Sequence, residues 1–248
     1  MARNLIVGQA VYVPWSRLGL DQAGASALTE ATVAEVVGRQ VVLNLPGGAQ
    51  SKTIGSSLVH EKDAAVLVVR IGDFATEPTL LDPLAKSLLQ YLRLLLPDDA
   101  VRILEIRSLA ELDQAWPINA PAFTNVVLVG HGSTTGVTFG VDGSVTADTL
   151  APHLTVDPAR KWSFLSLCCQ TGYAGFSKAL SRTAVCREII APFHSVHGAI
   201  ASQFAQSYFG YHFVQGETPS VAFRHARKAT PGAVSFRLWR NGTLSDAG

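Results

Sequence analysis

The stretch WSFLSLCCQTG, residues 162–172, places two adjacent cysteines and a polar turn at the end of an apolar run. Such a run, bounded by turn residues, is typical of a strand buried in a sheet. Two of the chain's three cysteines, Cys168 and Cys169, lie here. Because successive side chains of a strand point to opposite faces, we expect only one of these thiols to face a given partner beyond the strand end.

Similar apolar runs alternate with amphipathic segments from residue 64 onward. Runs of strand length cover residues 64–72, 100–106, 124–133, 162–169 and 187–193. Segments of helical character cover residues 78–99, 108–116, 173–183, 198–216 and 218–229. This alternation predicts an α/β sandwich with a mainly parallel sheet and helices on both faces.

The first 60 residues have a different pattern. Short β-branched runs at 9–15 and 39–45 are separated by Gly, Pro, Asn and Ser, which are strand and turn signals. We therefore expect a small β-rich, barrel-like domain over residues 1–60 and the α/β domain over residues 61–248. Segment 20–38 alternatively favours a short helix, since Ala and Glu are helix formers.

Composition and charge disfavour several classes of protein. The 248 residues are 48% hydrophobic and 16% charged, as expected of a globular chain with a sizeable core. A net charge of +1 without long Lys or Arg runs disfavours nucleic acid as the main partner. No apolar run approaches the roughly 20 residues of a membrane-spanning helix, and no signal-peptide pattern opens the chain, so we expect a cytoplasmic protein that does not bind membranes. Three cysteines without framework spacing predict reduced thiols.

Two predicted strand ends carry reactive side chains. Residues 124–133 deliver His131 between two glycines, and residues 162–169 deliver the two cysteines. In parallel α/β sheets, ligands and catalytic groups gather beyond the carboxyl ends of the strands. A thiol and an imidazole on adjacent loops are the minimal machinery for nucleophilic catalysis by cysteine.

Three segments together resemble one known family. VVLVGHGS (126–133) is similar to a strand that ends in a His-Gly pair, LCCQTGYAG (167–175) to a nucleophile turn, and residues 198–227 to a C-terminal helix pair. All three are features of the caspase-like cysteine peptidases, and within them of the CHAT branch common in bacteria. The resemblance covers roughly residues 62–235. It implies Cys169 as the nucleophile, with Cys168 in the place of a small residue.

The resemblance also implies a reaction. Such a peptidase cleaves a protein substrate through a thioester acyl-enzyme, with His131 as base and then acid. The backbone N–H groups of Gly132 and Cys169 would form the oxyanion hole. No metal or other cofactor is required. Bacterial relatives are often activated by a partner protein or a nucleotide signal, in antiviral defence or regulated cell death, and the β-rich N-terminal domain would be the sensing or docking part.

Expectations about specificity rest on three residues. Basic-specific members of the wider family carry an Asp two residues before the nucleophile, where this chain has Leu167. An apolar wall at that point disfavours Lys or Arg on the acyl side of the cut. Asp73, just past the first strand of the α/β domain, would restore a basic preference if it turned inward, and His194 follows another strand end beside the expected site.

Other functions must be weighed against this one. A serine hydrolase needs Gly-x-Ser-x-Gly, but Ser133 has His131 in the first glycine position. The cysteines lack the CxxC spacing of a zinc site, so no metal is expected there. A catalytically silent caspase-like module that binds a protein partner is the serious alternative.

Overall fold

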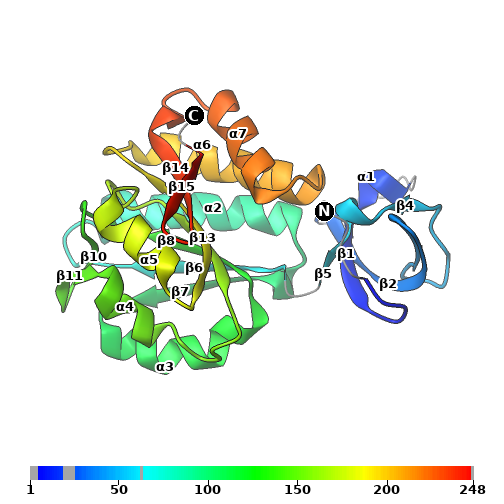
Figure 1. The fold of residues 1–248 in the computed structure, drawn as a ribbon, viewed down its shortest axis with the longest axis horizontal. Coiled ribbons are helices and arrows are strands. Elements are labelled where there is room, and N and C mark those ends of the chain that lie inside the picture. Colours follow the sequence, from blue (N-terminus) through cyan, green and yellow to red (C-terminus); the bar gives the residue numbers. More distant parts are fainter. Residues whose placement is uncertain (1–4, 19–25, 62–63, 247–248) are drawn as a thin grey trace.

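The central element of the protein is a seven-stranded sheet in the order β15-β14-β13-β12-β8-β6-β7 (Figure 1). The computed structural model describes residues 5–18, 26–61 and 64–246. The strands of the sheet are β6 (Val66–Ile71), β7 (Val101–Ile106), β8 (Asn125–Val129), β12 (Trp162–Ser166), β13 (Cys186–Pro192), β14 (Phe236–Arg240) and β15 (Thr243–Asp246). The first five are parallel, and the β14–β15 hairpin adds two antiparallel strands at one edge.

Three neighbouring interior strands are buried along their whole length. Every residue of β6, β8 and β12 is buried, as the continuous apolar runs in the sequence predict for strands covered on both faces. The helices are α2 (Asp82–Leu95), α3 (Leu109–Asn119), α4 (Ala147–His153), α5 (Ala179–Arg182), α6 (Gly198–Phe209) and α7 (Pro219–Ala229). Figure 1 shows α2, α6 and α7 on one side of the sheet and α3 and α4 on the other. The predicted α/β sandwich is confirmed.

Short helical turns complete several of these elements. Their bounds are η1 (Ser56–Leu58), η2 (Glu77–Leu81), η3 (Asp98–Ala100), η4 (Ala120–Ala122), η5 (Ala174–Lys178), η6 (Gly210–Val214) and η7 (Ala233–Ser235). A small antiparallel sheet of β9 (His131–Gly132), β10 (Gly136–Phe139) and β11 (Gly143–Thr146) lies after β8. Among the described residues, no helix has both the length and the apolar character that crossing a membrane requires.

The N-terminal region forms a separate antiparallel sheet. Its strands are β1 (Ala10–Pro14), β2 (Leu28–Val37), β3 (Gln40–Asn44), β4 (Ile54–Gly55) and β5 (His60–Glu61), in the order β4-β3-β2-β1-β5, with the one-turn helix α1 (Trp15–Leu18) after β1. The predicted β-rich character is therefore confirmed. The alternative helix within 20–38 is wrong for residues 28–37, where β-branched side chains pair as a strand, and residues 20–25 lie outside the described residues.

The N-terminal sheet packs directly against the α/β domain. Tyr12 and Leu28 are fully buried and belong to the main apolar core rather than to the core of their own sheet. The buried His60 donates from Nε2 to the carbonyl oxygen of Phe213, at 2.9 Å. The two parts therefore share apolar surface as well as a chain connection.

Candidate active site

His131 lies at the carboxyl edge of the large sheet, directly after β8. As part of β9 it pairs with Thr138 of β10, so the small sheet fixes its backbone. The flanking glycines allow close packing. A Cβ on Gly132 would lie 2.7 Å from the carbonyl oxygen of Cys169, and one on Gly130 would lie 2.9 Å from the carbonyl oxygen of Ile71. The turn that carries His131 is therefore in direct contact with the turn that carries Cys169.

The imidazole of His131 is held by a threonine and a carboxylate. Its Nε2 lies 2.6 Å from Thr76 Oγ1 and 3.1 Å from Asp73 Oδ2. The Thr76 hydroxyl donates its only hydrogen to Asp73 Oδ2, at 2.6 Å, so it must accept from His131. This arrangement assigns the proton of the neutral ring to Nε2 and leaves Nδ1 as the basic nitrogen.

Asp73 is itself fixed by the backbone that follows it. Its Oδ1 accepts from the backbone N–H groups of Ala75 and Thr76, at 2.8 and 2.7 Å. The Thr76 hydroxyl, opposed by partial desolvation and aided by these N–H groups and by His131, lowers the pKa of Asp73. The carboxylate is therefore ionised near neutral pH, and its Oδ2 lies 3.1 Å from His131 Nε2.

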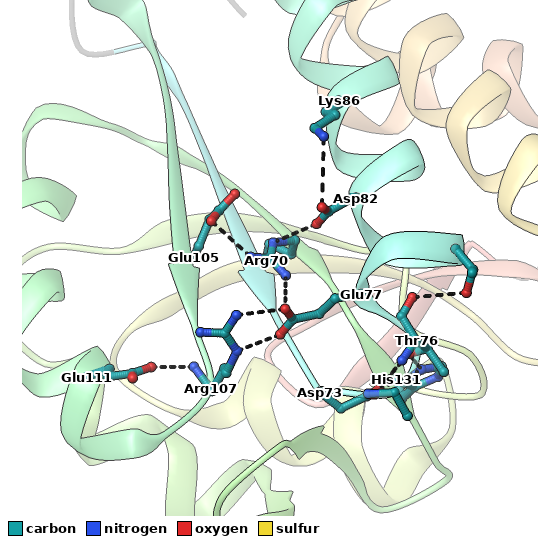
Figure 2. Close-up of polar contacts among 12 residues, drawn as sticks. Arg70, Asp73, Thr76, Glu77, Asp82, Lys86, Glu105, Arg107, Glu111 and His131 are labelled. Atoms are coloured by element: carbon teal, nitrogen blue, oxygen red, sulfur yellow. Dashed lines mark hydrogen bonds and ion pairs between the residues drawn. The ribbon is translucent and has the colours of Figure 1, made fainter.

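An ionic network anchors the turn that carries Asp73 and Thr76 (Figure 2). Glu77, the next residue, accepts two 2.7 Å hydrogen bonds from the guanidinium of Arg107. It also lies 3.3 Å from Arg70, which is only 4% exposed and pairs with Glu105 and Asp82 at 2.9 and 3.4 Å. These contacts fix η2 against β6 and β7, and so position the two partners of His131.

The two adjacent cysteines lie in different environments. Cys168 is completely buried, and burial raises the pKa of its thiol to about 12, so it stays protonated. Cys169 is partly exposed, with Sγ 3.8 Å from the carbonyl oxygen of Val196. Since a nucleophile must be accessible to its substrate, the buried and protonated Cys168 is the poorer candidate of the two.

The turn after β12 is stabilised by side chains that the sequence did not reveal. Ser166 and Thr171 share a buried hydrogen bond of 2.7 Å, and the Thr171 hydroxyl lies 2.8 Å from the carbonyl oxygen of Cys168. Gln170 has a φ of 61°, in the left-handed region that favours glycine. β12 ends at Ser166, so both cysteines lie in this turn rather than on the strand.

The three residues that the sequence suggested for substrate binding lie at different distances from the candidate site. Asp73 contacts His131, and its oxygens are occupied by Ala75, Thr76 and the imidazole. The exposed His194 borders the nucleophile turn, and its carbonyl oxygen accepts weakly from Gln170, at 3.5 Å. Leu167 is 4% exposed and packs into the main core. The roles proposed for these three residues in substrate binding stay predictions.

Sequence reasoning missed two residues at the candidate site. Thr76 follows Asp73 by three residues, a spacing at which an Asp side chain commonly accepts from the backbone, and that signal was available. The strained backbone of Gln170 left no such signal. Within the part of the chain that the structure describes, no group of three or more His, Cys, Asp and Glu side chains is placed to hold a metal ion.

Comparison with known proteins adds one finding. No protein-family model matches the chain, and no curated protein matches its sequence. Among solved structures, a secreted C11 cysteine protease from Bacteroides thetaiotaomicron, in complex with an irreversible peptide inhibitor, superposes with a TM-score of 0.52. The main domain has a caspase-like fold.

The extent of this match limits what it shows. It covers 72% of this chain and 66% of that protease, so the chain spans just under two thirds of the neighbour's length. The two sequences are 9% identical. At that identity the likeness establishes the fold, while the chemistry must be argued from the residues of this chain.

Proposed function

We propose that the protein is a cysteine endopeptidase in which Cys169 is the nucleophile and His131 its base. The observation that carries this proposal is the pairing of His131 Nε2 with Thr76 and Asp73, which directs the basic Nδ1 away from those partners. The close packing of Gly132 against the Cys169 turn, where a Cβ on Gly132 would lie 2.7 Å from the Cys169 carbonyl oxygen, supports a pairing of the imidazole with the accessible thiol. A caspase-like fold with a partly exposed thiol at the carboxyl edge of the sheet supports the same reading.

The first half of the reaction cleaves the peptide bond. The Cys169 thiol gives its proton to His131 Nδ1, and the thiolate attacks the carbonyl carbon of the substrate. The backbone N–H of Cys169 donates no hydrogen bond among the described residues, and with Gly132 it is the proposed donor to the oxyanion. The imidazolium, stabilised by Asp73, protonates the leaving nitrogen as the C–N bond breaks.

The second half releases the acyl group. Water gives a proton to His131 Nδ1 and attacks the thioester carbonyl. The C–S bond then breaks and Cys169 regains a proton. All protons move through one nitrogen of one imidazole, so Thr76 and Asp73 contribute by holding that ring in a single orientation.

Our proposal for the biological role of the peptidase rests on the sequence motifs alone. The LCCQTGYAG turn and the helix pair at 198–227 support a place in the CHAT branch, whose bacterial members are often switched on by a partner protein or a nucleotide signal. We therefore propose a regulated peptidase that acts on a dedicated protein, in defence or cell death. Capture of an activating partner from a bacterial host under phage infection, followed by mass spectrometry, tests that part.

The experiment for the chemistry is active-site labelling. The protein is treated with a peptide-like acyloxymethyl ketone, and the modified residue is identified by mass spectrometry in wild type and in the Cys169→Ala, Cys168→Ala and His131→Ala variants. Labelling at Cys169 that survives Cys168→Ala but is lost in the other two variants supports the proposal. If no variant is labelled, even with its partner present, the silent protein-binding module is the better account.

A further inference from the structure

The formal charges of the chain are divided unevenly along the sequence and across the sheet. Residues 158–248, which supply β12 to β15 and α5 to α7, contain ten Lys and Arg but only three Asp and Glu. Residues 1–157 contain ten Lys and Arg and sixteen Asp and Glu. The strands β12 to β15 are neighbours at one end of the sheet order. The basic residues therefore belong to one contiguous half of the α/β domain, and this half also contains Cys169.

Few acidic side chains can neutralise this basic half. Glu188 is buried and pairs with Arg240, and Glu217 pairs with His225 at 2.9 Å. Among the described residues, neither Arg227 nor Arg237 contacts a carboxylate. The guanidinium of Arg237 donates to the carbonyl oxygens of Val234 and Phe236, at 2.6 and 3.0 Å.

Arg227 and Arg237 are close enough to affect each other. Burial, and then the positive charge of Arg227, lower the pKa of Arg237. Nη1 of Arg227 is buried without a hydrogen-bond partner, and so is the hydroxyl of Ser235, two residues before Arg237. Two neighbouring like charges without a carboxylate partner are unfavourable, and an anion bound between them would offset their repulsion.

Arg237 lies near the turn that carries Cys169. The guanidinium of Arg237 lies 5.6 Å from the ring centre of Phe193, which stacks on Tyr173 with ring centres 3.8 Å apart. The backbone N–H of Phe193 donates to Ser235, and that of Gly172 donates to Pro192, both at 2.8 Å. Phe193 and Tyr173 therefore connect Arg237 to the turn that carries Cys169.

We propose that Arg227 and Arg237 form a subsite for an acidic side chain of the peptide substrate, outside the residue whose carbonyl is attacked. The inference rests on the proposed function and specifies its substrate class: protein segments rich in Asp or Glu near the cleaved bond. Arginine guanidinium groups suit this role, because they bind carboxylates in a planar, two-point geometry. The basic half of the α/β domain then attracts such segments over a longer range.

The test measures cleavage-site preference with the full-length protein. Labelling of Cys169 in the wild type by an uncharged ketone is checked first, because it reports the proposed function independently. Wild type then digests a proteome-derived peptide mixture, and the cut sites are read by mass spectrometry. One efficiently cleaved acidic peptide and its Asn or Gln counterpart are compared by kcat/KM at low and high salt.

Two variants distinguish binding by Arg227 and Arg237 from a general effect of the protein's positive charge. In the Arg227→Gln/Arg237→Gln variant, the ratio of kcat/KM for the acidic over the neutral peptide should fall about tenfold, the effect of one charged hydrogen-bonded pair. Arg102→Gln is the matched control, since this exposed arginine lies on β7 at the opposite edge of the sheet, where it donates to Asn119 Oδ1 at 2.6 Å. It should leave the ratio unchanged.

Each outcome has a distinct meaning. Labelled Cys169 with an equal preference for acidic and neutral peptides overturns the subsite and leaves the peptidase intact. An unlabelled Cys169 counts against the proposed function, and binding of the acidic peptide by fluorescence anisotropy then tests the arginines directly. Tighter binding of a single-stranded oligonucleotide than of an acidic peptide of equal charge would assign the basic surface to nucleic acid and overturn the inference.

Discussion

Gln170 follows the proposed nucleophile in a left-handed backbone conformation, with a φ of 61°. For a residue with a Cβ this conformation costs about 1–2 kcal/mol relative to the right-handed one. We expect Gln170→Gly to be neutral or to stabilise the protein by up to about 1 kcal/mol, whereas Gln170→Val should destabilise it, since β-branched residues tolerate positive φ poorly. The measurement is the free energy of unfolding in urea.

The matched control for Gln170 is Gln114, an exposed residue within α3. Glycine inside an exposed helix costs about 1 kcal/mol, so Gln114→Gly should destabilise the protein. An equal loss of stability at both positions would show that Gln170 is not strained.

The buried thiol of Cys168 gives a pH-dependent prediction. Its pKa rises from 9.0 to about 12 on burial, so the folded state holds this proton more tightly than the unfolded chain. The corresponding stabilisation is complete below about pH 9 and is lost as the pH rises toward 12. Relative to Cys168→Ala, the wild type should therefore lose about 1 kcal/mol of unfolding free energy between pH 8 and pH 10.

Urea unfolding of both proteins at the two pH values checks this prediction. Taking the difference between wild type and variant cancels the contributions of other groups that titrate at high pH. A difference that does not change with pH would mean that Cys168 is accessible to water, and the choice of Cys169 as the sole nucleophile would lose its main support.

At the residue scale, the positions of two candidate residues were predictable from the sequence. His131 and Cys169 each follow an apolar run, and strand ends in parallel sheets converge, so both were expected at the edge of the sheet where the structure has them. The Thr76–His131 contact joins residues 55 positions apart and depends on side-chain geometry, which no periodic pattern records. Asp73 was noted as a residue past a strand end, but its contact with His131 only became visible in three dimensions.

At the scale of an element, the contacts of Glu77 with Arg70 and Arg107 hold the segment from Asp73 to η2 in place. Glu77→Gln removes the charge that pairs with Arg107 and the buried Arg70. We expect a loss of about 1–3 kcal/mol in unfolding free energy, because one charged hydrogen-bonded partner disappears from a mostly buried set. We also expect slower alkylation of Cys169 by iodoacetamide at pH 7, since Thr76 and Asp73 then hold His131 less firmly.

Lys86→Ala is the control for Glu77. Lys86 lies at the exposed end of the same network, 3.8 Å from Asp82, and is 71% exposed. Its removal should change stability by less than about 0.5 kcal/mol and leave alkylation unaltered. Equal alkylation rates in wild type and Glu77→Gln would mean that the Glu77 contacts do not affect the reactivity of Cys169.

Long elements were predictable and short ones were not. The five parallel strands are continuous apolar runs, and Ser108 caps α3 by accepting from the backbone N–H of Glu111, as its position suggested. The β14–β15 hairpin was missed although its turn, Asn241-Gly242, is a known hairpin signal and both residues have positive φ. β10, β11 and α4 are short and partly polar, so their periodicity is weak.

At the scale of the whole molecule, the N-terminal sheet and the α/β domain share one core. Leu28 is fully buried in that core although it belongs to β2. We therefore expect a single cooperative unfolding transition, with equal calorimetric and van't Hoff enthalpies. Leu28→Ala should lower stability by about 2–5 kcal/mol and move the entire transition.

Differential scanning calorimetry provides this measurement. Two resolved transitions, of which Leu28→Ala moves only the first, would show that the N-terminal sheet folds independently. In that case it could be removed without unfolding the α/β domain, and its role as a docking part could be tested by deletion.

The uneven division of charge has a consequence for the protein in solution. A net charge of +1 is the sum of the basic half of the α/β domain and an acidic remainder, so we expect the molecule to have a large electric dipole near neutral pH. In dilute buffer, neighbouring molecules should align head to tail and associate. Salt should disperse them, because the screening length falls to about 10 Å at 0.1 M. The same chain should also be retained by both cation and anion exchangers at one pH.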